Sequence, residues 1–340
     1  MARCLQLAKK GIRNVFPNPM VGCVIVHQQK IIGEGYHEHF GAAHAEVNAI
    51  NSVKDKNLLT NSTLYVNLEP CAHFGKTPPC ADLITKYNIP KVVIGCVDSF
   101  AAVAGKGIEK LKTAGIEVMV GILEKESLAL NKRFFTFHQK KRPYVLLKWA
   151  VTKDGFMDVE RTNSNTIKDN WITSPTSKKL VHKWRSEEAA IMIGTNTALN
   201  DNPQLTVRDW QGKNPVRIVL DMNLRLPTSL QIFNTEADTI VLNSIKDEEE
   251  GNILYLRINP EDWLHDSLTK LYERHINSIL VEGGKQLLTS FINENLWDEA
   301  RVFTGNKTFG TGLSAPEIKA APNYTEKIAD DWLNVYENSN

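Results

Sequence analysis

Short apolar runs alternate with amphipathic segments along the first part of the chain. The strand-like runs are residues 21–26, 30–35, 63–68, 91–97 and 116–120, and Gly33 and Gly35 predict a bulge or a close backbone approach in the second of them. Segments with helical spacing are 5–10, 43–53, 79–87, 105–114 and part of 124–141. Strands that alternate with helices predict an α/β sandwich.

A second series of βα units follows a basic helix end at residues 138–142. The predicted strands are 144–149, 189–193, 217–220, 239–242, 252–257, 278–281 and 299–303. The predicted helices are 174–186, 260–275 and 285–295. The charge run Asp247–Glu250 predicts a solvated turn. We therefore place a domain boundary near Arg142, with one α/β domain over residues 1–141 and another over residues 142–340.

Composition narrows the class of protein. The chain has 340 residues, 42% hydrophobic and 23% charged, with a formal net charge of +1, which gives no support for a general nucleic-acid or membrane surface. No apolar run is long enough to span a bilayer, and the first residues lack the apolar core of a secretory signal. The natural start is left open, because the first predicted helix begins close to Met1. Five cysteines are too few for a disulfide framework and suit a reducing, cytoplasmic setting.

Two of the cysteines belong to a pattern with metal chemistry. His44 and Glu46 stand at the start of one predicted helix, and Cys71 and Cys80 flank the start of another. One imidazole and two thiolates suit Zn²⁺ and leave one tetrahedral position open for water. Glu46 is then suited to carry protons between that water and a departing amine, as in zinc-dependent base deaminases. The other cysteines, Cys4, Cys23 and Cys96, are predicted to be small buried residues.

Two other interpretations of the pattern remain open at this point. His44 and Cys71 are compatible with unrelated core positions. A structural zinc site is the second interpretation, and it requires a fourth ligand from Glu46 or His73.

The motifs around this pattern resemble one enzyme family closely. The segments 17–22, 35–37, 43–49 and 68–80 are similar to the deaminase domain of the bifunctional riboflavin-biosynthesis deaminase–reductase, including the eight residues between the two cysteines. The resemblance implies a cytidine-deaminase-like α/β/α sandwich and a small-molecule substrate, a pyrimidine ribotide. It also implies substrate contacts from Asn18, His37 and Lys76.

The second half lacks the G-x-G-x-x-G fingerprint of a Rossmann site, but Glu282–Lys285 forms a glycine-rich turn between a predicted strand and a predicted helix. By itself that turn is a weak phosphate-binding signal. Further motifs occur in the order of the same family's reductase domain, at 147–150, 154–155, 171–173, 194–197 and 201–208. The resemblance covers about residues 1–330 and implies a dihydrofolate-reductase-like α/β domain that uses NADPH.

The resemblance assigns roles in the reductase domain residue by residue. Those implied as cofactor contacts are Ala150, Trp171, Thr197, Asp201, Gly284, Lys285, Gln286, Leu287, Leu288, Thr289 and Ser290. Those implied as substrate contacts are Asp169, Arg185, Leu205, Arg208 and Glu282, with Arg185 and Arg208 suited to a phosphate. Lys148 and Glu282 are implied in proton handling beside the hydride transfer. The chain departs from the family at Phe156, where a lysine is frequent, and at Asp169, where a serine is usual.

The sequence thus predicts a two-domain cytoplasmic enzyme with one Zn²⁺ and NADPH as cofactors. It is expected to deaminate 2,5-diamino-6-ribosylamino-pyrimidinone 5′-phosphate by zinc-activated hydroxide and then to reduce the ribosyl group to ribityl. We expect a homo-oligomer without nucleic-acid or membrane partners. The alternatives are a nucleoside or tRNA deaminase with an unrelated C-terminal domain, and a zinc-stabilised scaffold without activity.

Overall fold

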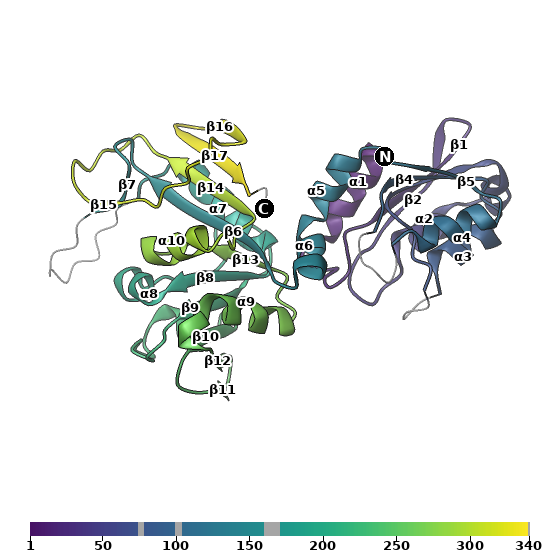
Figure 1. Cartoon of the computed structure of the whole chain (residues 1–340). Coiled ribbons are helices and arrows are strands. Elements are labelled where there is room, and N and C mark those ends of the chain that lie inside the picture. Colours follow the sequence, from purple (N-terminus) through teal and green to yellow (C-terminus); the bar gives the residue numbers. More distant parts are fainter. Residues whose placement is uncertain (74–77, 99–103, 160–170, 339–340) are drawn as a thin grey trace. The chain divides into compact units, whose positions relative to one another are not determined.

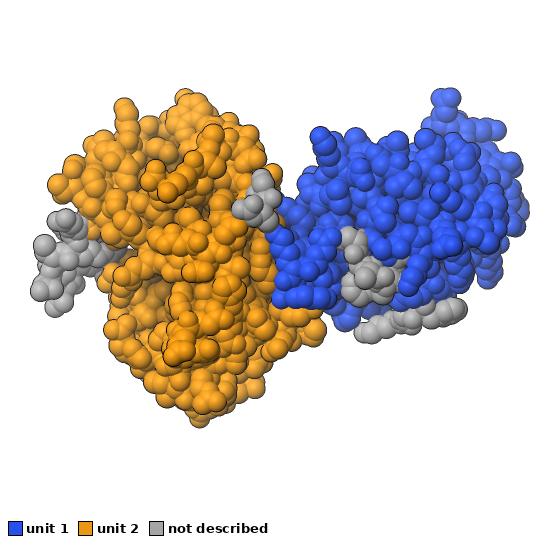
Figure 2. Space-filling view, in the orientation of Figure 1, with its two compact units in different colours: residues 1–141 blue, residues 142–340 orange. Residues whose placement is uncertain are grey.

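The structure is a computed structural model, and it describes residues 1–73, 78–98, 104–159 and 171–338. The chain divides into two compact units, residues 1–141 and residues 142–340 (Figures 1 and 2). Each unit has its own sheet and its own hydrophobic core. We therefore describe each unit by itself.

Unit 1 contains a five-stranded sheet with the order β2-β1-β3-β4-β5. The strands are β1 (Gly22–His27), β2 (Lys30–Tyr36), β3 (Thr63–Leu68), β4 (Lys91–Cys96) and β5 (Glu117–Val120). The helices are α1 (Ala2–Ala8), α2 (Ala45–Ser52), α3 (Cys80–Lys86), α4 (Lys106–Thr113), α5 (Glu124–Leu130) and α6 (Lys132–Lys140), with 3-10 turns at Lys9–Gly11 and Lys56–Asn61. Strand β1 is antiparallel to β2 and β3, whereas β3, β4 and β5 are parallel.

Two glycines place helices on opposite faces of this sheet. A Cβ at Gly22 would lie 2.1 Å from the carbonyl oxygen of Cys4 in α1, and a Cβ at Gly35 would lie 2.4 Å from the backbone nitrogen of Ala49 in α2. Gly35 pairs with Cys23, the neighbour of Gly22, so the two glycines face opposite sides of the sheet. The arrangement is the predicted α/β/α sandwich, and Gly35 provides the predicted close approach.

Unit 2 contains a ten-stranded sheet with the order β11-β12-β10-β9-β8-β13-β6-β14-β17-β16. Its strands are β6 (Tyr144–Val151), β8 (Ala190–Gly194), β9 (Val216–Leu220), β10 (Thr239–Asn243), β11 (Glu248–Glu250), β12 (Ile253–Arg257), β13 (Ser278–Val281), β14 (Glu299–Thr304), β16 (Tyr324–Ile328) and β17 (Asp331–Glu337). A two-stranded sheet joins β7 (Phe156–Asp158) to β15 (Leu313–Ser314). The helices are α7 (Pro175–Glu187), α8 (Thr195–Asp201), α9 (Trp263–Glu273) and α10 (Lys285–Asn293), with 3-10 turns at Gln231–Phe233 and Pro260–Asp262.

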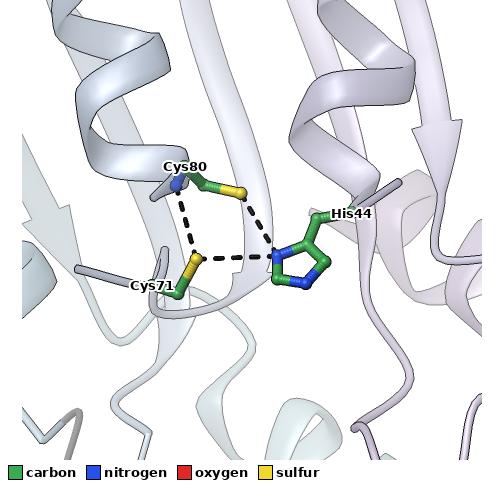
Figure 3. Close-up of side chains that lie close together, drawn as sticks. All are labelled: His44, Cys71 and Cys80. Carbon is green, nitrogen blue, oxygen red and sulfur yellow. Dashed lines mark hydrogen bonds between the residues drawn. The ribbon is translucent and has the colours of Figure 1, made fainter. Parts of the chain in front are cut away.

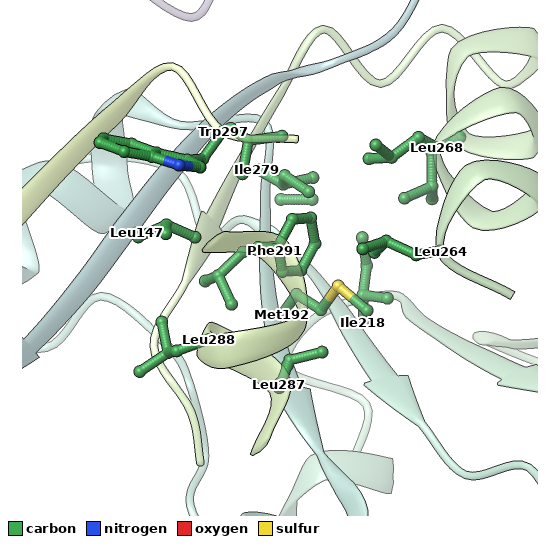
Figure 4. Packing of buried hydrophobic residues seen from close by; sticks show 14 of the residues in the cluster. Leu147, Met192, Ile218, Leu264, Leu268, Ile279, Leu287, Leu288, Phe291 and Trp297 are labelled. Atoms are coloured by element: carbon green, nitrogen blue, oxygen red, sulfur yellow. The ribbon is translucent and has the colours of Figure 1, made fainter. Parts of the chain in front are cut away.

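The strands from β12 to β14 are parallel in the order of the sheet, so their carboxyl ends meet along one edge. Side chains alternate between two cores: Val145 and Leu147 of β6 belong to one, and Leu146 belongs to the other. Figure 4 shows the first core, in which Phe291 of α10 packs among strand residues such as Ile279. Both faces of the sheet are therefore covered, as parallel sheets require.

Several sequence-based expectations need correction. The charge run predicted as a turn contains the exposed edge strand β11, because the edge position lets its three glutamates remain in solvent. The segment 124–141 holds two helices, separated at Asn131. The strands β16 and β17 and the helix α8 were not predicted. In contrast, Cys4, Cys23 and Cys96 are buried, as predicted.

Candidate active sites

The residues predicted to bind zinc converge in unit 1. His44 was predicted to lie inside a helix, but it is the N-cap of α2, one residue before the helix begins. Cys80 is the first residue of α3. Cys71 follows β3, and the nitrogen Nδ1 of His44 lies 3.5 Å from its sulfur and 3.4 Å from that of Cys80 (Figure 3). The potential metal-ligating atoms of these three residues all lie within 4.8 Å of one another. No other such group of histidine, cysteine or acidic residues occurs within the described residues.

The donor set and its dimensions fit zinc. A tetrahedral ion with usual Zn–N and Zn–S bonds has N···S edges of about 3.6 Å, close to both separations. One imidazole and two cysteine sulfurs are ligand types that zinc prefers, and the backbone N–H of Cys80 also donates to the sulfur of Cys71. Among the protein groups alone, Cys80 and His44 lower the pKa of Cys71 to about 4, so a thiolate is already favoured. His73 does not belong to the group, which removes one fourth ligand considered for a structural site.

Glu46 lies on the first turn of α2 and lines the same cavity as His44 and Cys71. The cavity measures about 320 Å³, a size suited to a small molecule. Glu46 is 3% exposed, and burial, assisted by the negative charge of Cys71, raises its pKa to about 7. A carboxyl with a pKa near neutrality both accepts and releases a proton readily.

Asn18 and His37 line this cavity as well. The amide nitrogen Nδ2 of Asn18 lies 3.0 Å from Nε2 of His37, and Nδ1 of His37 lies 3.0 Å from the carbonyl oxygen of Ala43. Burial lowers the pKa of His37. The third predicted contact, Lys76, lies outside the described residues.

Sequence reasoning assigned no role to Glu69, which also lines the cavity. Its carboxylate is buried and accepts four backbone N–H groups, from Asp98, Gly105, Gly107 and Ile108, at 2.9–3.2 Å. A Cβ at Gly107 would lie 1.9 Å from the carbonyl oxygen of Pro70, next to Cys71. Glu69 therefore joins the loop that carries Cys71 to the start of α4. In the sequence, the feature that could have indicated this role is an acidic residue, Glu69, placed directly between a buried strand and Pro70.

Three of the residues implied in the reduction, Lys148, Arg185 and Glu282, lie close together at the carboxyl edge of the sheet in unit 2. Glu282 follows β13, and its two carboxylate oxygens each accept a hydrogen bond of 2.8 Å from the guanidinium of Arg185 on α7. The Nζ of Lys148 on β6 lies 4.0 Å from Glu282. Burial by itself would raise the pKa of Glu282, but Arg185 and Lys148 outweigh it and lower that pKa to about 2. Burial lowers the pKa of Lys148.

The predicted substrate contacts of unit 2 occupy different environments. Arg185 is largely buried and also donates to the carbonyl oxygen of Thr206. Its guanidinium is therefore bonded to Glu282 and Thr206 within the protein. Arg208 is exposed and donates to Gln204. Leu205 has a φ of 57°, a strained value for a bulky residue, and its side chain lies in the core. Asp169 lies outside the described residues.

The predicted cofactor segment begins at the turn between β13 and α10. Gly284 has a φ of 67°, which favours glycine, and a Cβ there would lie 3.1 Å from Oγ1 of Thr197. The turn therefore keeps open a recess that a side chain would fill, which suits close approach of a dinucleotide phosphate to the backbone. Leu287 and Leu288 point into the core (Figure 4), so their side chains are not available to a cofactor.

The other predicted cofactor contacts are more exposed. Trp171 is exposed beside Lys178, and Lys285 donates to Ser314. Thr289 has a buried hydroxyl with no hydrogen-bond partner among the described residues. The remaining positions are Ala150 on β6, Asp201 at the end of α8, and Gln286 and Ser290 on α10.

Comparisons with known proteins agree with this arrangement. Residues 1–96 match the family model of the cytidine and deoxycytidylate deaminase zinc-binding region, and residues 143–325 match that of the RibD C-terminal domain. Riboflavin biosynthesis protein RibD of Aquifex aeolicus is 43% identical over 94% of this chain and 89% of its own length. The chain belongs to the RibD family.

Other members are similar over nearly their whole length. RibD of Escherichia coli is 35% identical, with 97% of this chain and 92% of that protein covered. A Thermotoga maritima crystal structure, described as a diaminohydroxyphosphoribosylaminopyrimidine deaminase/5-amino-6-(5-phosphoribosylamino)uracil reductase, is 38% identical with a TM-score of 0.89 and covers 99% of this chain and 97% of that one. Acinetobacter baumannii RibD, form 1, is 31% identical with a TM-score of 0.87 and covers 100% of this chain and 98% of that one.

Membership in the RibD family confirms the main sequence-based predictions. The chain is a bifunctional enzyme of riboflavin biosynthesis, with a zinc-binding deaminase domain and an NADPH-using reductase domain. The alternative with an unrelated C-terminal domain is wrong, because that half is the RibD C-terminal domain. Among the described residues, no helix combines the length and apolar character needed to cross a membrane.

A pH-dependent contribution to stability arises beside the reductase cluster. Nδ1 of His182 accepts the backbone N–H of Arg208, and Nε2 lies 3.5 Å from Asp209. Burial, assisted by the charge of Arg185, lowers the pKa of His182 to about 4. The unfolded chain, with an ordinary pKa near 6.5, binds a proton here that the folded chain does not, so unit 2 should lose stability as the pH falls from about 6.5 to 4. The expected loss is roughly 1–3 kcal/mol.

All seven tryptophans lie in residues 142–340, so tryptophan fluorescence during urea unfolding reports on unit 2. His182→Gln keeps a donor and an acceptor but does not titrate. It should therefore flatten the pH dependence of the unfolding free energy. An unchanged slope in this variant would assign the acid sensitivity to other groups.

Proposed function

We propose that the chain converts 2,5-diamino-6-ribosylamino-pyrimidinone 5′-phosphate to its ribityl product in two steps, deamination followed by reduction. The observation that carries this proposal is the similarity, over 99% of the chain, to the Thermotoga maritima enzyme described as catalysing these two reactions. The cavity of unit 1 and the ion-pair cluster of unit 2 supply the groups that such steps require.

In the deamination, His44, Cys71 and Cys80 hold zinc, which supplies Lewis-acid activation of water when it is bound. Glu46 would take a proton from the attacking water on its carboxylate and deliver it to the amine that leaves the pyrimidine ring as ammonia. Support for this role comes from its burial and from its pKa near 7. Asn18 and His37 line the cavity in which the substrate would lie, and Lys76 is a further candidate for a substrate contact.

In the reduction, the turn at Gly284, Thr197 and the start of α10 would hold NADPH, which would supply the hydride. The paired carboxylate of Glu282, whose pKa is about 2, remains ionised and stabilises positive charge near the sugar carbon. Burial lowers the pKa of Lys148, which makes Lys148 suited to transfer the proton that accompanies the hydride. The exposed cation Arg208 binds the substrate phosphate, while Arg185 holds Glu282 in place.

A coupled assay tests the proposal as a whole. The full chain is given the diaminopyrimidine ribotide, and ammonia, NADPH and zinc are measured in the same sample. We expect NADPH oxidation only after ammonia release, or at once when the deaminated product is supplied. Equal oxidation with the undeaminated ribotide would contradict the order of the two steps.

Removal of zinc should separate the two activities. Chelation of the full chain, or the variant Cys80→Ser, is expected to abolish ammonia release and leave NADPH oxidation with deaminated product within about twofold. Added Zn²⁺ should restore the chelated enzyme but not the variant. Cys4→Ala is the matched control, because Cys4 is a buried cysteine outside the metal group. Full activity after chelation would exclude the zinc mechanism.

The proposal includes a homo-oligomer in the cytoplasm. Edge strand β5 and the residues after it expose Met119, Val120 and Ile122, and such apolar edges favour self-association. The five cysteines are free thiols, which suits a reducing compartment. Sedimentation analysis of the purified chain tests the assembly, and a monomer at micromolar concentration would rule it out.

A further inference from the structure

Asn18 and His37 are joined by a hydrogen bond, and this bond determines which group Asn18 presents to a substrate. His37 directly follows β2 and is 2% exposed, and Asn18 lies between Pro17 and Pro19. Both side chains line the cavity that contains the metal ligands. Their hydrogen bond, 3.0 Å from Nδ2 of Asn18 to Nε2 of His37, joins two segments of the cavity wall.

The carbonyl oxygen of Ala43 determines which nitrogen of His37 carries the proton. A carbonyl oxygen only accepts, so Nδ1 of His37, at 3.0 Å, must donate to it. The amide nitrogen Nδ2 of Asn18 faces Nε2 and can only donate, so this geometry corresponds to a ring with a single proton, on Nδ1. Nε2 is then a bare acceptor.

The orientation of the Asn18 amide follows from this tautomer. Only the NH₂ group can donate to a bare Nε2, so Nδ2 faces His37 and Oδ1 lies on the other side of the amide. Among the residues that the structure describes, none donates to Oδ1 of Asn18. Both ring nitrogens of His37, in contrast, are already occupied by protein groups.

We propose that His37 is a positioning residue that fixes the Asn18 amide, so that Oδ1 of Asn18 accepts a hydrogen bond from an N–H or O–H group of the substrate. This inference rests on the proposed deaminase function and revises the expectation that His37 itself contacts the substrate. The substrate recognised here must carry a donor at this point, as the amino groups and hydroxyls of an aminopyrimidine ribotide do. A reversed amide would direct its NH₂ at that donor and lose the contact.

The tautomer is directly measurable in the full-length enzyme. Selective ¹⁵N labelling of histidine distinguishes a protonated from a bare ring nitrogen by chemical shift, and His37→Gln identifies its signals. We expect a protonated Nδ1 and a bare Nε2 for His37 in the zinc-loaded protein. The opposite tautomer, or a doubly protonated ring, at neutral pH would overturn the proposal.

Three substitutions separate positioning from direct binding. A glutamine at position 37 offers an N–H for Ala43 and an oxygen for Asn18, as the neutral ring does, whereas phenylalanine offers neither. We expect His37→Gln to stay within about threefold of wild type in kcat/KM for ammonia release. We expect His37→Phe and Asn18→Ala each to lose about tenfold or more, mainly through KM.

The double variant decides between the two roles. If His37 acts only through Asn18, adding His37→Phe to Asn18→Ala causes little further loss. Losses that multiply, or a failure of His37→Gln, would show that the ring itself binds substrate and would overturn the inference. Zinc content near one per chain in each variant shows that the site is intact. Absence of ammonia release by the wild type would instead contradict the proposed function, so the two failures are distinguishable.

Discussion

Glu46→Gln is expected to retain zinc and to lose ammonia release by about 10²–10⁴-fold, the usual contribution of a positioned general acid–base group. The substitution keeps the shape of the side chain but removes its ability to exchange a proton. Because Glu46 is buried beside Cys71 and is not one of the three ligands, metal binding should persist. The measurement is the rate of ammonia release together with metal content.

Glu38→Gln is the matched control for this prediction. Glu38 lies close in sequence, is exposed, and does not line the cavity, so its loss should leave the rate unchanged. NADPH oxidation with deaminated product should be normal in both variants. If Glu46→Gln retained a rate within tenfold of wild type, proton transfer would have to be assigned elsewhere. If it lost its zinc, Glu46 would instead be a ligand.

Glu282→Gln is expected to abolish NADPH oxidation and to destabilise unit 2. Removing one partner of a buried ion pair leaves the other charges unpaired and costs about 3–5 kcal/mol. Here the unpaired groups are Arg185 and Lys148. Tryptophan fluorescence during urea unfolding gives the stability of unit 2, and we expect a reductase rate at least a hundredfold lower. Ammonia release by unit 1 should continue.

An exposed ion pair provides the comparison. Glu248 pairs with Lys246 on the edge strand β11, where solvent weakens the interaction, so Glu248→Gln should change the unfolding free energy by less than about 1 kcal/mol. Equal effects of the two substitutions would show that the cluster at Glu282 is no stronger than a surface pair. A stable Glu282→Gln variant with normal NADPH oxidation would remove Glu282 from the proposed mechanism.

The alternation of apolar and amphipathic segments predicts most of the architecture, because buried strands such as Thr63–Leu68 have few alternatives. Edge elements are different. The strand Tyr324–Ile328 is largely exposed and lacks an apolar stripe, so it forms only because β17 offers it a hydrogen-bonding partner. The same holds for Glu248–Glu250, where neighbouring backbone outweighs the turn preference of a charge run.

The two sites differ in how far the sequence predicts them. The metal group depends on a few residues of distinctive chemistry. The helix predicted from residue 43 begins at Ala45, and this difference of two residues does not alter the position of His44. In unit 2, residue types do not reveal that Arg185 bonds to Glu282. That contact joins a helix to a strand end 97 residues later, and only the folded sheet brings the two together. The amide orientation of Asn18 likewise depends on a carbonyl at Ala43.

The four hydrogen bonds accepted by Glu69 have a practical consequence for protein engineering. They secure the backbone at Asp98 and at Gly105, whereas the metal ligands belong to other segments. A single carboxylate thus holds the backbone of Asp98 and of Gly107 at one point, next to the loop that carries Cys71. Redesign of the metal centre therefore has to keep Glu69, because its replacement would release both anchor points beside a zinc ligand.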